Sequence, residues 1–279
     1  MGTPDSSGRS RVRPASATLE TSSGAPRRGR DERIERFDGA AVTVALITGA
    51  AHRVGRELAL GFAAAGYAVA VHYRSSREAA DATVGEAARL GAPAAAFPAD
   101  LSDPAAPASL VAAVLARFGR LSALVHAASP WVEGPVEGVG LADWEAVFSV
   151  GPRAAFFLSQ AAAPALSRED GSILLVSDVA ARKAWPRHVP HAAAKAAIDS
   201  LVVNLAVALS PRVRVNGIAP GIVLPPEEMT REEVDRLVAR TPLRRRVATD
   251  DLVAVAVAMV RNRSLTGQVL AVDAGRSVV

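Results

Sequence analysis

Three side chains that could transfer a proton are spaced so that two of them share a helix face. Asp178 follows the apolar segment 171–177, His191 comes thirteen residues later, and Lys195 lies four positions beyond His191. Residues four apart lie on one face of a helix. A carboxylate can orient an imidazole, an imidazole can transfer a proton, and an ammonium can hold a hydroxylated ligand and lower the pKa of a neighbour. The spacing predicts a proton-transfer group; a single His is more often structural, and His188 is an alternative.

The scarcity of lysine adds weight to Lys195. Lys183 and Lys195 are the only lysines in the chain, and every other basic residue is arginine. A compact ammonium with an adjustable pKa does work that a guanidinium does poorly. We therefore expect a specific role for Lys195 and interpret Lys183 as chance.

A turn with two glycines links a predicted strand to a predicted helix near residue 50. Residues 42–47 are apolar and β-branched, as in a strand buried on both faces. Gly49 permits the bend, Arg53 and Val54 follow it, and Gly55 lets the helix start approach another surface. Free N–H groups at that helix start would bind a pyrophosphate. The turn alone fits an ordinary strand-to-helix connection equally well.

The rest of the chain alternates between short apolar segments and helical patterns. Such alternation predicts a parallel sheet covered on both faces, and right-handed crossovers then give a single doubly wound α/β domain, a Rossmann fold, over 39–279. Residues 1–38 are rich in Ser, Gly, Pro and Arg, which predicts a disordered tail. The predicted strands are 42–47, 67–73, 93–98, 121–126, 171–177, 213–217 and 268–272. The predicted longer helices are 76–90, 103–118, 141–166, 189–209, 227–240 and 250–260.

Residues after the second predicted strand favour a phosphorylated dinucleotide. A sheet that binds NAD usually places an acid there for the ribose 2′-hydroxyl. This chain instead has Arg74 and Ser75, and Arg53 can face the same position. A guanidinium and hydroxyls suit a 2′-phosphate. The predicted cofactor is therefore NADP(H) rather than NAD(H).

The ends of the third and fourth predicted strands supply further candidates. Asp100 and Leu101 are placed to border an adenine. The small residues Ala128 and Ser129 would allow a flat ring to approach closely. Trp131 could stack on a planar substrate, although an aromatic residue packed under a loop is an equal alternative.

The segment after the sixth predicted strand closes the site. Pro220 and Gly221 fix an irregular backbone there, and Leu224 is a candidate substrate contact. The charged helix predicted over 227–240 follows directly. We expect it to act as a lid over the substrate.

Composition excludes several classes of function. The absence of Cys excludes disulfides, thiolate metal ligands and a Cys nucleophile, and no metal site is predicted. The net charge of +4 is already accounted for by the six Arg, Asp5 and Glu20 within residues 1–30, so nucleic-acid binding is not expected. No apolar stretch of membrane-spanning length and no signal peptide is apparent. A cytoplasmic protein that is not bound to a membrane is the expectation.

The order of these motifs resembles the short-chain dehydrogenase/reductase family over residues 42–279. That resemblance implies an NADP-dependent oxidoreductase acting on a small molecule, and a homo-oligomer, by analogy a tetramer. Four segments match family motifs directly: the Thr-Gly turn 48–55, Asp100-Leu101, Pro220-Gly221 and 266–275. Residues 126–129 stand where the family has Asn-Asn-Ala-Gly, and residues 191 and 195 stand where it has Tyr-x-x-x-Lys.

Within the family the chain is most similar to the pteridine reductases. Arg53 replaces the middle glycine of the usual turn, and Asp178 stands where most members carry the catalytic Ser. Segments 71–75 and 272–277 also match that branch. The resemblance implies that Trp131 sandwiches a pterin against the nicotinamide, that Lys195 holds the nicotinamide ribose, and that the substrate is pterin-like or a carbonyl compound.

The chain also departs from the family pattern. His191 occupies the position of the family's catalytic Tyr. Gly151 replaces an Asn that holds a relay water, and His126 and Ala127 replace a pair of Asn residues. Free Tyr has a pKa of about 10 and free His of about 6.5, so the proton chemistry must differ. Two hypotheses follow: an altered reductase, or a catalytically impaired dinucleotide-binding sensor or partner subunit. Nucleic-acid binding through the Arg-rich tail is the least favoured interpretation.

Overall fold

The computed structural model describes residues 43–226 and 229–279. The predicted tail, 1–38, lies outside the described residues. So do residues 227 and 228, the first two of the helix predicted over 227–240.

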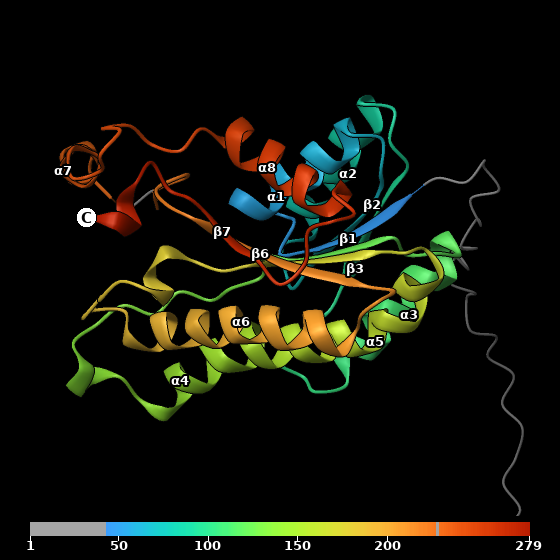
Figure 1. Cartoon of the computed structure of the whole chain (residues 1–279), viewed down its shortest axis with the longest axis horizontal. Coiled ribbons are helices and arrows are strands. Elements are labelled where there is room, and N and C mark those ends of the chain that lie inside the picture. The colour runs from blue at the N-terminus through green and yellow to red at the C-terminus, as the bar shows by residue number, and fades with distance from the viewer. Residues whose placement is uncertain (1–42, 227–228) are drawn as a thin grey trace, which may run out of the picture. The chain divides into compact units, whose positions relative to one another are not determined.

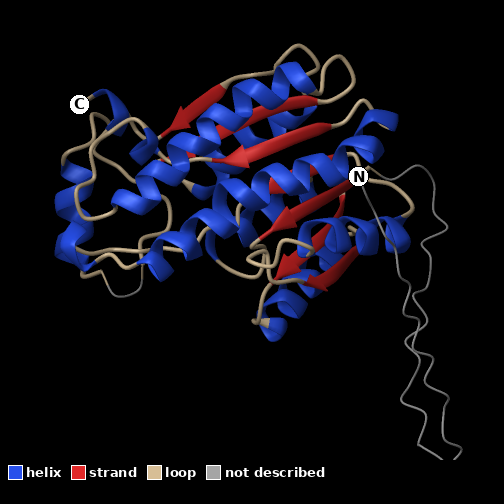
Figure 2. Ribbon diagram, turned by 90° about the horizontal axis from the view of Figure 1, so that it is seen from below, coloured by secondary structure: helices blue, strands red, loops and turns tan. Residues whose placement is uncertain are grey.

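Within the described residues, one parallel sheet of seven strands has the order β3-β2-β1-β4-β5-β6-β7. All neighbouring strands run parallel, and Figure 2 shows their arrows pointing the same way. The order reverses between β1 and β4, and such a reversal is where doubly wound sheets bind ligands, outside the carboxyl ends of the strands. The strands are β1 Val44–Thr48, β2 Ala68–Tyr73, β3 Ala94–Pro98, β4 Ala123–His126, β5 Ser172–Val176, β6 Arg214–Pro220 and β7 Val269–Val272.

Helices cover both faces of this sheet, as predicted. One hydrophobic core joins the sheet to α1, α2 and α8, and the other joins it to α3, α5 and α6. Figure 1 shows these groups on opposite sides of the strands. The strands β1, β2, β4 and β5 are buried along their whole length, which explains their almost uninterrupted apolar sequences. The helices are α1 Arg53–Ala64, α2 Arg77–Arg89, α3 Ala106–Phe118, α4 Leu141–Phe148, α5 Ala154–Arg168, α6 Val189–Ala208, α7 Arg231–Ala239 and α8 Thr249–Arg261.

The single long helix predicted over 141–166 is wrong. α4 ends at Phe148, a π-helical turn spans Ser149–Arg153, and α5 begins at Ala154. Gly151 has non-helical backbone angles (φ −76°, ψ −106°). The next residue, Pro152, has no N–H to donate to the preceding turn, so the regular hydrogen-bond ladder is interrupted here.

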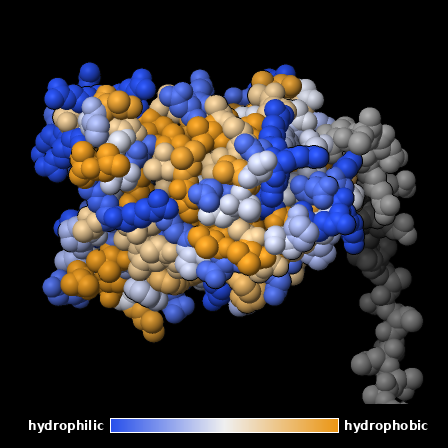
Figure 3. Space-filling model, in the orientation of Figure 1, coloured by the Kyte–Doolittle hydropathy of each residue, from blue (hydrophilic) through white to orange (hydrophobic). Residues whose placement is uncertain are grey.

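The charged helix α7 starts later than the sequence pattern predicts. Thr230 Oγ1 accepts a hydrogen bond from the Glu233 N–H at 3.2 Å, and the Glu233 carboxylate accepts one from the Thr230 N–H at 2.8 Å. This reciprocal capping fixes the helix start at Arg231. Figure 3 shows hydrophilic atoms gathered at the upper left, where Figure 1 places α7.

Among the described helices, only α6 is long and apolar enough to span a membrane by length and composition. Its residues Ile198 and Val202 are buried against the sheet. The apolar composition of α6 is therefore that of a core helix, and the same helix carries His191 and Lys195.

Candidate functional site

A cleft of about 1390 Å³ opens at the carboxyl ends of the strands and is lined by every residue predicted to contact substrate or cofactor or to transfer a proton. Its walls come from the segments after β1 to β6, together with α6 and α7. The sequence-predicted residues in its lining are Gly49, Arg53, Val54, Gly55, Arg74, Ser75, Asp100, Leu101, Ala128, Ser129, Trp131, Asp178, His191, Lys195, Pro220, Gly221 and Leu224. The structure thus brings these residues together in one cavity; their individual roles stay proposals.

The turn after β1 is closed by contact between its two glycines. Gly49 has a φ of +66°, and a Cβ on Gly55 would lie 2.1 Å from the Gly49 carbonyl oxygen. His52 precedes α1 without capping it through its side chain, and the first turn of α1 has no acidic residue. The first N–H groups of this helix therefore lack a side-chain cap, an arrangement that suits a pyrophosphate.

Arg53 departs from its expected orientation. Its φ is +50°, a left-handed conformation that favours glycine. Its guanidinium Nη2 donates a hydrogen bond to the Leu224 carbonyl at 2.6 Å, linking the turn after β1 to the segment after β6. The expectation that Arg53 faces the same position as Arg74 is therefore corrected, because this main-chain carbonyl holds its guanidinium instead.

Exposed Arg74 and Ser75 follow β2 in the cleft, and no acid accompanies them at that strand end. Asp100 lies after the neighbouring strand β3, where its carboxylate accepts hydrogen bonds from the Ser102 hydroxyl and N–H at 2.7 and 2.9 Å. These bonds, and to a smaller extent the charge of Arg74, lower the pKa of Asp100. A guanidinium and a hydroxyl at the end of β2 fit a ribose 2′-phosphate.

A buried histidine organises the turns after β1 and β4. His126 donates from Nε2 to the Val150 carbonyl at 3.1 Å and accepts at Nδ1 from the Thr48 hydroxyl at 2.9 Å. The Thr48 oxygen in turn accepts the N–H groups of Ala127 and Ala128 at 3.0 and 3.1 Å. Burial lowers the pKa of His126 to about 3, so the ring is neutral. The helix break described above leaves the Val150 carbonyl free to accept this bond.

His72 plays a corresponding role on the other side of β1. Its Nδ1 accepts the Gly49 N–H at 3.1 Å, and its Nε2 donates to the Ala99 carbonyl at 3.1 Å. Burial lowers its pKa to about 4. Neither histidine was predicted to support these turns, although a histidine near the end of an otherwise apolar strand is a signal that could have indicated it.

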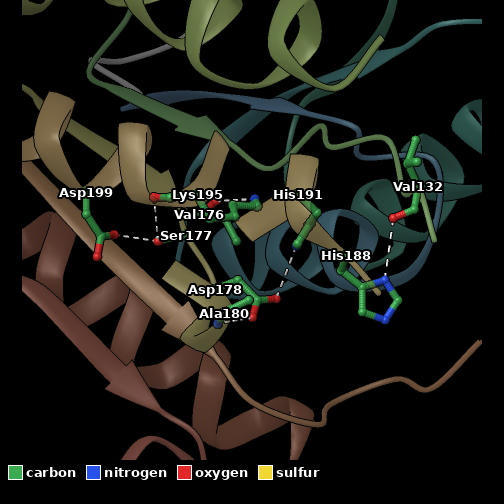
Figure 4. Close-up of polar contacts among 9 residues, drawn as sticks. All are labelled: Val132, Val176, Ser177, Asp178, Ala180, His188, His191, Lys195 and Asp199. Carbon is green, nitrogen blue, oxygen red and sulfur yellow. Dashed lines mark hydrogen bonds and ion pairs between the residues drawn. The ribbon is translucent and has the colours of Figure 1, made fainter. Parts of the chain in front are cut away.

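Lys195 lies buried on α6 at the end of β5. Its Nζ donates a hydrogen bond to the Val176 carbonyl at 2.7 Å (Figure 4). Burial lowers its pKa to about 8, and the charges of Asp178 and Asp199 offset part of that effect. The neighbouring Ser177 hydroxyl donates to the Asp199 carboxylate, so it is already engaged away from the proton-transfer group.

His191 and Asp178 face one another in the cleft, as Figure 4 shows. His191 Nε2 lies 3.6 Å from Asp178 Oδ2, while Asp178 Oδ1 accepts the Ala180 N–H at 2.8 Å. His191 is only 3% exposed, and neither of its ring nitrogens has a hydrogen-bond partner among the described residues. Buried polar atoms without partners are rare in proteins, and in a cleft they are available to a ligand.

Aromatic residues extend from His191 along the substrate end of the cleft. The ring centroid of Trp131 lies 4.7 Å from those of both His191 and His188, and Trp131 is 48% exposed. Trp185 follows at 5.2 Å from His188, and the Arg276 guanidinium lies 4.9 Å from the Trp185 ring centroid. The sequence analysis assigned no site role to Trp185 or Arg276. The third tryptophan of the chain, Trp144, stacks on Phe148 and does not line the cleft.

The remaining predicted residues border the end of β6. A Cβ on Gly221 would lie 2.7 Å from the Cα of Asp273, so only a glycine lets these two segments meet. Leu237 of α7 also lines the cleft. The action of this helix as a lid stays a prediction.

Comparison with known proteins agrees with this arrangement. Residues 49–277 match a family model described as Enoyl-(Acyl carrier protein) reductase. The chain is 33% identical over 258 residues to versicolorin reductase stcU of Emericella nidulans, covering 86% of this chain and 96% of that protein.

Two solved structures have the same fold at similar identity. FolM alternative dihydrofolate reductase 1 from Brucella canis, complexed with NADP, is 31% identical with a TM-score of 0.80, covering 85% of this chain and 94% of that chain. A short chain dehydrogenase from Burkholderia cenocepacia J2315, in complex with NADP, is 33% identical with a TM-score of 0.79, covering 84% and 97%.

Sequence, fold and site together define a dinucleotide-binding oxidoreductase architecture. The chain belongs to the short-chain dehydrogenase/reductase family. This membership confirms the family and the fold that the motifs predict.

Proposed function

We propose that this protein is an NADPH-dependent reductase that transfers hydride to a pterin-like or carbonyl substrate. The observation that carries the proposal is the placement of Asp178, His191 and Lys195 in one cleft with the glycine turn and Arg74. The proposed cofactor agrees with the solved relatives that were crystallised with NADP.

The cofactor-binding role is divided between the two ends of the cleft. Arg74 and Ser75 bind the 2′-phosphate, the start of α1 binds the pyrophosphate, and Asp100 and Leu101 border the adenine. Lys195 holds the nicotinamide ribose; the Val176 carbonyl fixes its Nζ, and Lys195 lines the cleft. Arg53, Val54, Ala128, Pro220 and Gly221 shape the walls around the cofactor.

The proton must come from the substrate end. NADPH supplies the hydride when bound, and reduction of a C=N or C=O bond then requires one proton on the nitrogen or oxygen. His191 is the group placed to give it, because its ring nitrogens are free of other partners among the described residues. Asp178 orients the ring and stabilises its protonated form. Trp131 stacks on the planar substrate, with Ser129 and Leu224 lining the same region.

The test compares cofactors and substrates on the purified protein. We expect calorimetric titration to give at least tenfold tighter binding of NADPH than of NADH, and NADPH oxidation with dihydrobiopterin, dihydrofolate or a quinone. A preference for NADPH without turnover above the level of Asp178→Ala would instead favour a dinucleotide-binding protein with impaired catalysis. Equal affinity for the two cofactors would contradict the assignment of Arg74 and Ser75.

We also propose that the protein forms a homo-oligomer. Exposed apolar side chains lie on two helices, Phe156 and Phe157 on α5 and Val203 and Val207 on α6. Light scattering of the purified protein at several concentrations tests this. A strictly monomeric mass would contradict it.

A further inference from the structure

Beyond the catalytic group, the substrate end of the cleft has a side pocket with an unusual charge. The pocket has a volume of about 230 Å³ and is lined by Lys183, Trp185, Leu237, Arg240 and Arg276, with Ala184. All of these except Lys183 also line the main cleft, so the two spaces are continuous. Whole small-molecule sites occupy roughly 300–1,000 Å³. The pocket is therefore suited to a substituent of a substrate rather than to a whole one.

The pocket lies at the end of the aromatic wall that starts at His191. Trp131 contacts His191 and His188, His188 contacts Trp185, and the Arg276 guanidinium lies over the Trp185 ring. A planar substrate placed against Trp131, with its reacting atom near His191, would direct a substituent along this wall. The substituent would then reach Trp185 and Arg276.

Three cations line this pocket. Lys183 Nζ donates to the Arg276 carbonyl at 3.1 Å and to the Val279 main-chain oxygen. Within residues 43–226 and 229–279, the side chains of Arg240 and Arg276 make no ion pair or hydrogen bond. Burial lowers the pKa of Arg276, and the negative charges of Asp178 and Asp273 offset part of that effect. The positive charge of Arg240 lowers it further, so the two guanidinium groups lie within electrostatic range of each other.

Among the described residues no carboxylate forms an ion pair with Arg240 or Arg276, although the charges of Asp178 and Asp273 act on Arg276. Glu133 pairs with Arg187 at 3.1 Å, and Glu233 accepts the Thr230 N–H at 2.8 Å. Asp273 accepts the main-chain N–H groups of Gly275 and Ser277 at 2.9 and 2.6 Å. The lining of the pocket itself includes three cations and no carboxylate, and the guanidinium donors of Arg240 and Arg276 have no partner among the described residues.

We propose that the substrate carries an anionic substituent, a carboxylate or a phosphate, which Arg240 and Arg276 bind beside Trp185. This rests on the proposed function, because the substituent is placed by a planar ring that stacks on Trp131. A guanidinium presents parallel N–H donors that match the two oxygens of a carboxylate or phosphate. Trp185 packs against the apolar part of the substituent. The reductase is thereby specific for planar substrates with an acidic side group.

The experiment measures binding of matched acid and neutral probes to the NADP⁺-saturated protein by calorimetry. The first pair is 6-carboxypterin and 6-hydroxymethylpterin, and the second pair, with no pterin ring, is 2-naphthoate and 2-naphthamide. A third comparison, 2-naphthyl phosphate with 2-naphthoate, separates a phosphate from a carboxylate preference. We expect each acid to bind about tenfold tighter than its neutral partner, because hydrogen bonds to charged groups are the stronger ones.

Substitutions of the two arginines test whether the preference for the acid over its neutral partner arises in this pocket. In Arg240→Met/Arg276→Met the advantage of the acid is lost, whereas NADP⁺ affinity is unchanged, which also shows that the variant folds. The single variant Arg240→Met, at an exposed position, loses part of the preference for the acid. Arg245→Met, an exposed arginine outside the cleft, removes the same charge and keeps the full preference.

The outcomes separate this inference from the proposed function. If neither acid is preferred over its neutral partner, or if the double variant keeps the preference, the inference is overturned. If 2-naphthoate binds more tightly than 2-naphthamide but neither pterin binds, the inference about the anionic substituent is supported, and the pterin part of the proposed function fails. If the double variant loses NADP⁺ affinity instead, the two arginines serve the cofactor and the inference is wrong.

Discussion

His191 Nε2 lies 3.6 Å from Asp178 Oδ2, and both atoms face the same cleft as Lys195. The distance is longer than a hydrogen bond, and the ring has no other partner among the described residues. Catalytic hydrogen bonds are often long without substrate and shorten when it binds. A modest approach on substrate binding would bring the pair into hydrogen-bond contact, as the proposed roles of proton donor and orienting acid require.

Substitution of this pair should reduce turnover without affecting cofactor binding. We expect His191→Phe and Asp178→Asn each to lower kcat by about 10²-fold, the usual contribution of general acid catalysis, while the Kd for NADPH changes little. Steady-state kinetics and calorimetry on the same preparations measure the two effects. Asp81→Asn, an exposed carboxylate outside the cleft, is the matched control and should match the wild type. Unchanged kcat in both variants would remove these residues from the mechanism.

Burial of His126 should make the fold sensitive to mild acid. Its pKa of about 3 in the folded protein is below the ~6.5 of an unfolded chain, so protons bind preferentially to the unfolded state. The free energy of unfolding should therefore fall as the pH falls below ~6.5, by about 2 kcal/mol between pH 6.5 and 5 for this group.

Urea unfolding of wild type and His126→Asn across that pH range measures the effect. The variant removes the titrating ring, so its stability should fall less steeply, with a residual slope from His72, whose pKa is about 4. The two proteins are compared by the slope of the unfolding free energy against pH, because the variant also loses stability at neutral pH and its absolute values are therefore lower. Parallel curves for the two proteins would contradict the neutral state of His126.

Arg53 and Arg244 offer a matched test of a left-handed arginine inside and outside the cleft. Their φ angles are +50° and +47°, and Arg244 does not line the cleft. A glycine relieves strain of about 1 kcal/mol at such a position. We expect Arg244→Gly to stabilise the fold by this amount without changing NADPH affinity.

Arg53→Gly should relieve the same strain and yet weaken NADPH binding by several fold. It removes both a cation at the start of α1 and the hydrogen bond to the Leu224 carbonyl, which keeps the segments after β1 and β6 in place. Calorimetry and urea unfolding measure the two quantities. Equal NADPH affinity in the two glycine variants would show that Arg53 has no part in the cofactor site.

Gly55 and Gly85 form a second matched pair. A Cβ on Gly55 would lie 2.1 Å from the Gly49 carbonyl oxygen, whereas a Cβ on Gly85, within α2, would meet nothing within 4 Å. Gly55→Ala should therefore destabilise the fold by about 1–3 kcal/mol, as overpacking does, and abolish tight NADPH binding. Gly85→Ala should stabilise the fold by about 0.5–1 kcal/mol and leave binding unchanged. Tight NADPH binding by Gly55→Ala would contradict the role given to this turn.

The sequence was sufficient for the sheet, the layers and the location of the cleft. Buried parallel strands are visible as apolar runs, and their carboxyl ends must meet at one edge of the sheet, so Asp178, Lys195 and Arg74 could be assigned to a common site. The roles within that site stay predictions. The family resemblance added that Trp131 would sandwich a pterin against the nicotinamide and that His191 stands at the position of the catalytic Tyr.

The features that were missed depend on contacts between distant segments. Next to the break at Gly151, the Val150 carbonyl accepts a hydrogen bond that His126 donates from 24 positions away, and a helical pattern alone does not indicate it. Arg53 reaches Leu224 across the cleft. Trp185 and Arg276 come from segments far apart in the sequence, and neither residue has a local pattern that predicts their contact.

The placement of the three tryptophans gives the molecule an internal optical probe. Trp131 and Trp185 line the cleft, and Trp144 stacks on Phe148 outside it. In a Trp144→Phe background all indole emission would arise beside the bound substrate. Its intensity and wavelength would then follow each stage of ligand entry in real time, without any attached dye.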